Sequence, residues 1–121
     1  MDKKAKGAFG ESLAAEYLAD RGYKIIERNW RCRYGEIDII AEKNGVIAFV
    51  EVKTRRENAM VQPFEAVGFS KQKKIILSAE CYLQNCEKEL QPRFDVAGIT
   101  ESKGTFKIDY LENAFDSGAA V

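Results

Sequence analysis

Two carboxylates and one lysine, Asp38, Glu51 and Lys53, lie on either side of the Asn-Gly pair at residues 44–45. Asn-Gly is the strongest short signal for the two-residue turn of a β-hairpin, because both residues tolerate positive φ. With that turn, the two segments pair so that Asp38 lies directly opposite Glu51, and Glu36 opposite Lys53. The spacing therefore predicts that acidic and basic side chains from two antiparallel strands meet at one place.

The predicted pair of carboxylates is the chemical centre of this sequence. Side chains directly opposite each other have Cβ atoms about 4.5–5.5 Å apart, so Asp38 and Glu51 would repel each other. A divalent cation relieves that repulsion, and Mg²⁺ commonly takes one or two carboxylates together with water and substrate phosphate. The alternative is a solvated face with scattered charges, which antiparallel sheets often carry. We favour the metal site, because Glu51 and Lys53 lie in a very apolar segment where an isolated charge is unfavourable.

Hydrophobic periodicity predicts the elements that must position these side chains. We expect a helix over 8–21, strands over 23–30, 36–43 and 46–54, a loop over 55–69, a helix over 71–87 with Ser70 as its N-cap, and strands over 93–100 and 105–111. The expected order is αβββαββ, an α/β fold with a mixed β-sheet flanked by helices. Within the strand over 36–43, Ile37, Ile39 and Ala41 are expected to share one face. The chain of 121 residues fits a single domain, residues 1–121.

Both predicted helices add polar side chains on or near their buried faces. At about 100° per residue, Glu11 falls at the edge of the inward face of the first helix. Gln72 lies one turn before Ile75 and Ile76, on the buried stripe of the second helix. We favour a role in the site for Glu11, whereas for Gln72 an ordinary solvent-exposed helix end explains the position equally well.

Basic residues are concentrated next to the predicted acidic site. The net charge is zero, with 19 basic and 19 acidic residues, which argues mildly against tight nonspecific binding of nucleic acid by an isolated monomer. The basic residues nevertheless form two clusters, one over 28–34 that alternates with Trp30 and Tyr34, and one over 53–74. Cations interleaved with aromatic rings suit phosphates and unstacked bases, although a solvated charged face would have the same composition. The candidate nucleic-acid contacts are Arg28, Arg31, Arg33, Arg55, Arg56, Lys73 and Lys74.

The composition excludes several kinds of active site. The sequence has no histidine, which removes serine–histidine triads and the usual zinc sites. Its three cysteines lack metal-ligand spacing and are expected to be reduced thiols. No stretch has the roughly 18 apolar residues of a membrane span, and the basic N-terminus lacks the apolar run of a signal peptide. We therefore expect a cytoplasmic protein without a membrane partner, whose chemistry uses carboxylates, lysine, tyrosine or a metal.

Two motifs at the hairpin resemble the signature of the PD-(D/E)xK nucleases. GEID at 35–38 supplies the first acidic residue, Asp38, and FVEVKTR at 49–55 supplies the E-x-K triplet, although Ile37 replaces the proline of the signature. The whole chain also resembles the YraN-type family, an uncharacterised bacterial family. The matching stretches are GxxGExxAxxYL (7–18), NWRCRYGEIDII (29–40), FVEVKTR (49–55), KQKK (71–74), RFDV (93–96) and LENAF (111–115).

The resemblance implies a restriction-endonuclease-like core, similar to that of Holliday-junction resolvases, and a divalent metal, Mg²⁺ or Mn²⁺. The metal ligands would be Asp38, Glu51, Glu11 and the backbone carbonyl of Val52. Lys53 would orient the attacking water and stabilise charge at the phosphate, and Gln72 would position that water or a phosphate. Asp95, within the RFDV stretch, is expected to be a structural hydrogen-bond acceptor or ion-pair partner.

Three hypotheses about function follow from the residues and the resemblance. The first is a metal-dependent DNA endonuclease or exonuclease, selective for branched or unpaired structures and acting in repair or recombination. The second is a nucleic-acid-binding module on the nuclease fold, with weak or no catalysis. The third is a metal enzyme that hydrolyses another phosphoester, such as RNA or a nucleotide; we favour DNA over RNA. A homodimer would pool two basic patches on one face.

Overall fold

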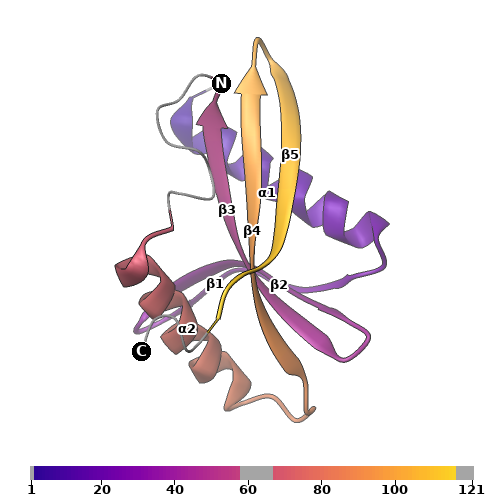
Figure 1. Cartoon of the computed structure of the whole chain (residues 1–121), viewed down its shortest axis with the longest axis vertical. Helices are drawn as coiled ribbons and strands as arrows, with labels where there is room; N and C mark the ends of the chain where they lie inside the picture. Colours follow the sequence, from indigo (N-terminus) through magenta and orange to yellow (C-terminus); the bar gives the residue numbers. More distant parts are fainter. Residues whose placement is uncertain (1, 58–66, 117–121) are drawn as a thin grey trace.

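Two helices and five strands make up the parts of the chain that the structure describes. The computed structural model describes residues 2–57 and 67–116. The elements are α1 (Lys3–Asp20), β1 (Lys24–Cys32), β2 (Gly35–Lys43), β3 (Val46–Arg56), α2 (Phe69–Leu83), β4 (Gln91–Ser102) and β5 (Thr105–Phe115). This is the predicted order αβββαββ (Figure 1). Neither of these two helices is long and apolar enough to cross a membrane.

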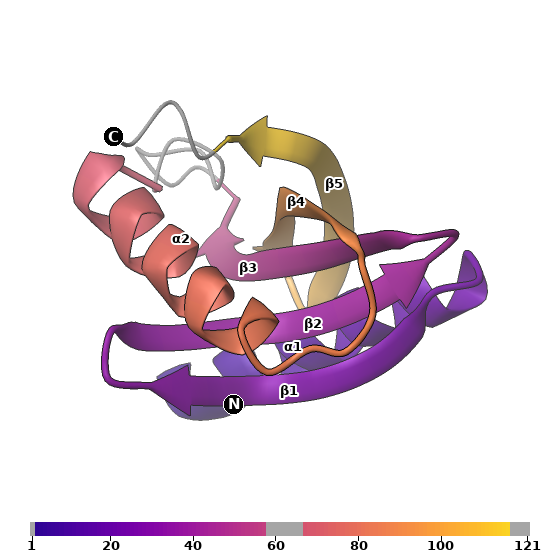
Figure 2. The same cartoon turned by 90° about the horizontal axis from the view of Figure 1, so that it is seen from below.

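All five strands belong to one sheet with the order β1-β2-β3-β4-β5. The pairs β1–β2, β2–β3 and β4–β5 are antiparallel, whereas β3 and β4 are parallel. A parallel pair requires a crossover connection, and α2 lies in it. The two helices cover opposite faces of the sheet (Figure 2). The mixed sheet flanked by helices is therefore confirmed.

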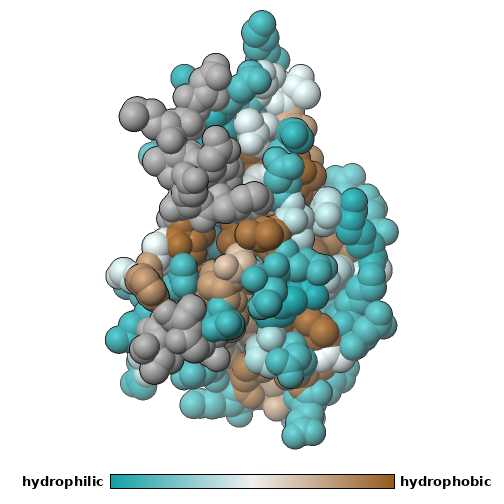
Figure 3. All heavy atoms as spheres, in the orientation of Figure 1, coloured by the Kyte–Doolittle hydropathy of each residue, from teal (hydrophilic) through white to brown (hydrophobic). Residues whose placement is uncertain are grey.

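Two hydrophobic clusters, one on each face, hold the sheet against its helices. The cluster under α2 includes Phe49 and Ile76, and the cluster under α1 includes Leu18 and Val50. Neighbouring residues of β3 belong to opposite clusters, because successive side chains of a strand point to opposite faces. In Figure 3 the coloured part of this face is largely hydrophilic, and hydrophobic residues show between the hydrophilic ones at several places. β3 is thus a central strand, packed on both faces, on which site residues can be held in place.

The turn at residues 44–45 has the predicted geometry, since both residues have positive φ, 50° and 80°. The predicted hairpin register is confirmed from this turn to the pair Ile39–Val50. Beyond that pair the prediction is wrong, because the β2–β3 ladder ends there while β3 continues to pair with β4. Asp38 and Glu51 are therefore not ladder partners, and the predicted pairing of residues 36 and 53 is absent too.

α1 begins earlier than hydrophobic periodicity predicts, at Lys3 rather than at residue 8. The Asp2 side chain caps the helix by accepting a hydrogen bond of 2.7 Å from the backbone N–H of Ala5. The residues that follow are largely lysine, alanine and glycine. They carry no apolar stripe, so the periodic signal begins only at Phe9.

α2 and β3 also differ from their predicted bounds. Gly68 is the N-cap, with an extended backbone (φ −80°, ψ 175°), so Ser70, the predicted N-cap, lies inside the first turn. α2 ends at Leu83 instead of residue 87. β3 extends to Arg56, into the predicted loop over 55–69, and residues 58–66 of that loop lie outside the described part of the chain.

Asp95 holds β4 and β5 together where the register of their ladder shifts. Its carboxylate is fully buried and accepts hydrogen bonds from both Nε (2.9 Å) and Nη2 (2.8 Å) of Arg93. It also accepts from the Tyr110 hydroxyl at 2.6 Å and the backbone N–H of Asn113 at 2.9 Å. Burial and the charge of Asp95 raise the pKa of Tyr110, which keeps the hydroxyl a donor. The predicted structural role of Asp95 is confirmed.

Replacing Asp95 tests the importance of this network for stability. We expect Asp95→Asn to lower the free energy of unfolding by about 3 kcal/mol, because it removes the buried anion of the Arg93 guanidinium and leaves only the exposed Glu112 at 3.6 Å. Tyr110→Phe removes one neutral donor and should lower it by about 1 kcal/mol. Urea denaturation measures both. A loss below about 1 kcal/mol for Asp95→Asn would show that the network contributes little.

Candidate functional site

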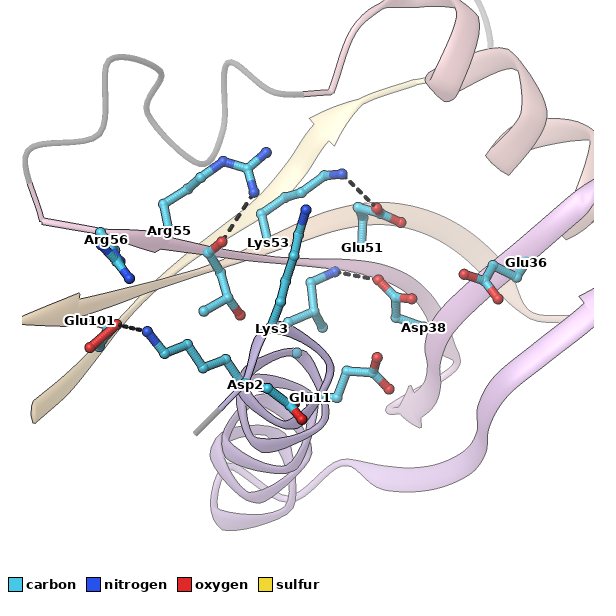
Figure 4. A pocket seen from close by; sticks show the side chains of 14 residues that line it. Asp2, Lys3, Glu11, Glu36, Asp38, Glu51, Lys53, Arg55, Arg56 and Glu101 are labelled. Atoms are coloured by element: carbon cyan, nitrogen blue, oxygen red, sulfur yellow. Dashed lines mark hydrogen bonds and ion pairs between the residues drawn. The ribbon is translucent and has the colours of Figure 1, made fainter. Parts of the chain in front are cut away.

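A groove of about 700 Å³ lies between the first half of α1 and the adjoining ends of β2, β3 and β4. One end of the groove is acidic, and its carboxylates are Glu11, Glu36, Asp38 and Glu51 (Figure 4). The other end carries Arg55 and Arg56, and Lys3 and Lys53 lie between the two ends (Figure 4). A single groove thus offers oxygen ligands for a cation next to basic groups for an anion.

Asp38 lies at the point where β2 diverges from β3. The residue is 8% exposed, and its Oδ2 accepts a hydrogen bond of 2.8 Å from the backbone N–H of Val52. The carboxylate thus takes the place of the main-chain acceptor that a continued ladder would supply. β2 also turns over here, since Ile37 packs in the cluster under α2 and Ile39 in the cluster under α1. The prediction that Ile37 and Ile39 share a face is wrong.

The pKa of the Asp38 carboxyl is raised from 3.8 to about 7. Burial is the main cause, and the negative charge of Glu51 is the second. Glu11 and Glu36 raise the pKa further, whereas the hydrogen bond from the Val52 N–H opposes the shift. The ionised form of Asp38 is therefore unfavourable in this environment, and a bound cation would relieve that disadvantage.

Glu51 lies between two lysines. The residue is 5% exposed, and its Oε1 is 3.2 Å from Nζ of Lys53 and 3.3 Å from Nζ of Lys71. Lys53 is a predicted site residue, but Lys71, on α2, was not singled out from the sequence. The signal for it was present, because Lys71 lies four residues before the buried Ile75 and so shares its stripe of the helix.

Glu11 reaches the groove because α1 packs very closely against β3. Gly10 is buried, and a Cβ atom at this position would overlap the hydroxyl of Thr54. The close approach places the next residue, Glu11, in the acidic end of the groove, where it faces Asp38 (Figure 4). The described residues nevertheless contain no group of three or more potential ligand side chains close enough to hold a metal as they stand.

The structure does not bring Gln72 into the groove. Its side-chain amide donates a hydrogen bond of 2.9 Å to the backbone carbonyl of Val67, just before α2 begins. The amide therefore supports the start of the helix. The side chain that α2 directs toward the acidic residues is that of Lys71, one position earlier.

The basic end of the groove contains two of the predicted nucleic-acid contacts, Arg55 and Arg56. Lys3 and Lys6 line the same groove, and sequence reasoning missed both because the helix was expected to begin only at residue 8. Lys6 is paired with Glu101 at 2.7 Å across the groove. The first turns of α1 therefore contribute positive charge beside the end of β3.

The other predicted basic contacts lie outside this groove. Arg31 and Arg33 line a shallow hollow of about 420 Å³ at the β1–β2 turn, which shares Glu36 with the groove. In this hollow the Arg33 guanidinium lies 4.8 Å from the ring centroid of Tyr34. The remaining predicted contacts, Arg28, Lys73 and Lys74, are exposed and lie outside both hollows.

The raised pKa of Asp38 predicts a pH-dependent stability for the metal-free protein. Between about pH 4 and pH 7 the folded state binds the proton of Asp38 more tightly than the unfolded state, so this residue lowers stability as pH rises through that window. Asp38→Asn keeps an acceptor for the Val52 N–H and removes the charge. We expect it to raise the free energy of unfolding by ~2–4 kcal/mol at pH 8 and by little at pH 4.

Urea denaturation in EDTA at several pH values measures this effect. Glu36→Gln is the matched control, since Glu36 lines the same groove but is exposed and paired with Arg31 at 3.2 Å. The control should change stability by less than about 0.5 kcal/mol at every pH. Equal stability of Asp38→Asn and wild type at pH 8 would show that the Asp38 carboxyl is not disfavoured in the fold.

Comparison with known proteins identifies the family. The model of the family described as Uncharacterised protein family UPF0102 matches residues 10–99. The calcium complex of SfsA from Pyrococcus furiosus is similar at a TM-score of 0.42, with 19% identity over 93% of this chain and 64% of that one.

Curated relatives match over nearly the whole chain. A UPF0102 protein of Caldanaerobacter subterraneus subsp. tengcongensis is 44% identical over 119 residues, covering 95% of this chain and 98% of the relative. A UPF0102 protein of Nocardia farcinica is 47% identical over 116 residues, covering 94% of this chain and 91% of the relative. The chain belongs to the uncharacterised protein family UPF0102, the YraN-type family that its motifs resemble.

Proposed function

We propose that this protein is a metal-dependent nuclease that hydrolyses phosphodiester bonds in DNA, with a preference for branched or unpaired structures such as those formed in repair and recombination. The observation that carries the proposal is the buried Asp38, whose pKa is raised by burial and by Glu51, in a groove whose other end is basic. Charged groups disfavoured in this way mark functional sites more often than scaffolds.

The donor set suits a hard divalent cation, Mg²⁺ or Mn²⁺. Asp38 and Glu51 supply carboxylate oxygens from two strands, and Glu11 lies close enough to Asp38 to raise its pKa. In an extended strand the N–H and C=O of one residue point to the same side. Since the N–H of Val52 points to Asp38, its carbonyl also faces that side, which supports Val52 as a backbone ligand. When bound, such a metal lowers the pKa of a water molecule and neutralises charge on phosphate oxygens.

Lys53 is the group we assign to the attacking water and the reacting phosphate. Its side chain is 18% exposed and its ammonium lies 3.2 Å from Glu51, so the carboxylate holds it at the acidic end of the groove. From there a fixed positive charge stabilises the negative charge that develops during hydrolysis. We assign Asp38 and Glu51 to metal binding, and Lys53 to charge stabilisation and orientation of the water.

The basic end of the groove would bind the phosphates next to the cleaved bond. Arg55 and Arg56 supply positive charge there, and Lys3 adds to it from the middle of the groove, which gives affinity without sequence specificity. The groove has the volume of a small-molecule site, so it accepts part of one strand more readily than a whole duplex. That size supports a preference for unpaired or branched DNA. A homodimer, which would place two such grooves on one branched molecule, is part of this proposal.

Cleavage of a panel of linear, flapped, forked and four-way DNAs with Mn²⁺ tests the proposal. We expect hydrolysis of at least one structured substrate, and about a hundredfold or greater loss of rate in Asp38→Asn and Lys53→Ala, because each removes a group used in the transition state. Lys88→Ala is the control, since Lys88 is exposed and outside the groove, and pairs with Glu42. RNA of the same structures should be cut more slowly.

The absence of cleavage, together with Mn²⁺ binding that Asp38→Asn leaves unchanged, would refute the nuclease. Equal rates for wild type and Lys53→Ala would instead attribute any cleavage to a contaminant or to another site. Faster cleavage of RNA than of DNA would support the third hypothesis, a different phosphoester substrate.

A nucleic-acid-binding module with weak or no catalysis is the second candidate. Two observations favour it. Glu51 is already paired with Lys53 and Lys71, and the described residues contain no group of three or more potential ligand side chains close enough to hold a metal. For such a module we expect DNA affinity to survive EDTA and Lys53→Ala. It should fall about tenfold or more in Arg55→Ala/Arg56→Ala at low salt, because two phosphate contacts are lost. Fluorescence anisotropy with a labelled fork measures this, and an unchanged affinity in the double variant would place the binding surface elsewhere.

A further inference from the structure

α2 contacts the acidic site through an ion pair that the proposed reaction does not use. Nζ of Lys71 lies 3.3 Å from Oε1 of Glu51, the same oxygen that Lys53 contacts at 3.2 Å. Lys53 and Glu51 are two residues apart on β3, whereas Lys71 comes from a helix on one face of the sheet. The two lysines therefore reach one carboxylate oxygen from different parts of the fold.

The positive charge at Glu51 already exceeds its negative charge without a metal. Its carboxylate provides one negative charge, and the ammonium groups of Lys53 and Lys71 provide two positive charges at the same oxygen. Adding a divalent cation next to both lysines would place a large excess of positive charge around one carboxylate, and like charges at short range disfavour one another. A metal that takes Glu51 as a ligand must therefore compete with at least one of the lysines.

Lys71 is the lysine that can leave. Its side chain is 42% exposed, compared with 18% for Lys53, so it reaches solvent with less change in its surroundings. A lysine side chain is also a flexible four-carbon stem with a strongly hydrated head, which favours movement between partners. Release of Lys71 would leave Lys53 in place and free a positive charge at the acidic end of the groove.

We propose that Lys71 forms an ion pair with Glu51 in place of the metal. When the metal binds, the Lys71 side chain moves from Glu51 to a phosphate of the nucleic acid. This inference rests on the proposed metal-dependent function and adds a regulatory contact to it. In the metal-free protein Lys71 compensates the negative charge of Glu51, and this ion pair keeps Lys71 away from DNA. With the metal bound, Lys71 becomes a DNA ligand, so metal and DNA strengthen each other's binding, as coupled equilibria require.

Lys71→Met tests the inference, because methionine keeps an apolar stem and removes the charge. We expect the variant to bind Mn²⁺ alone about two- to fivefold more tightly than wild type in calorimetric titration, the range that fits a partly exposed ion pair. Lys88→Met is the control, since Lys88 is an exposed lysine outside the groove that pairs with Glu42. Its affinity for Mn²⁺ should equal that of wild type.

A second readout is the affinity for a labelled forked DNA, measured by anisotropy in EDTA and again with saturating Ca²⁺. We expect Lys71→Met to weaken binding severalfold with Ca²⁺ and to leave it unchanged in EDTA, where Lys71 is held by Glu51. A loss of the same size under both conditions would overturn the inference, since Lys71 would then be an ordinary phosphate contact. Mn²⁺ affinity that is equal to or weaker than that of wild type would overturn it as well.

The outcome for wild type separates this inference from the proposed function. Binding of Mn²⁺ by wild type, with no difference in Lys71→Met, would overturn only the role of Lys71. Binding of Mn²⁺ by Lys71→Met but not by wild type would support that role in its strongest form. If neither protein binds Mn²⁺, both the metal-dependent function and the inference that rests on it are overturned.

Discussion

The hydrogen bond from the Val52 N–H to the Asp38 carboxylate is the interaction on which the site depends. It lets β2 separate from β3 without leaving a buried amide unsatisfied, and the groove opens beside this separation. Asp95 does the same for β5, by accepting from the Asn113 N–H where the β4–β5 register shifts. The two aspartates differ in their partners. Asp95 has Arg93, which makes it structural, whereas Asp38 faces further carboxylates, which makes its environment suited to a cation.

Much of the fold could be predicted, because it follows from local patterns. The order of elements, the turn at residues 44–45 and the first five pairs of the hairpin all agree with the sequence. The end of the ladder could not be predicted, since it depends on a side chain, that of Asp38, replacing a main-chain acceptor. The start of α1 was missed because its first turns are fixed by the cap at Asp2 and not by apolar residues.

The residues of the candidate site on the hairpin and on α1 could be predicted, whereas the contribution of α2 could not. Asp38, Glu51, Lys53 and Glu11 all line one groove, because residues close together on a hairpin and one helix face suffice to place them. From α2, Gln72 was one of the candidates for the site, but its neighbour Lys71 makes the contact with Glu51. Residues 71 and 72 both lie about one turn before the buried stripe. Their directions differ by about 100°, which is no more than the width of the stripe itself, so periodicity does not separate them. Only the packing of α2 on the sheet decides between them.

The absence of a side chain at Gly10 has a consequence for any attempt to rebuild this site elsewhere. The close packing of α1 on Thr54 sets how far Glu11 extends over the sheet, so a single methyl group at residue 10 would act as a spacer between helix and strand. Copying the acidic and basic side chains onto another mixed sheet would therefore reproduce the composition of the groove but not its width. The separation of the helix from β3 has to be transplanted along with the charged residues.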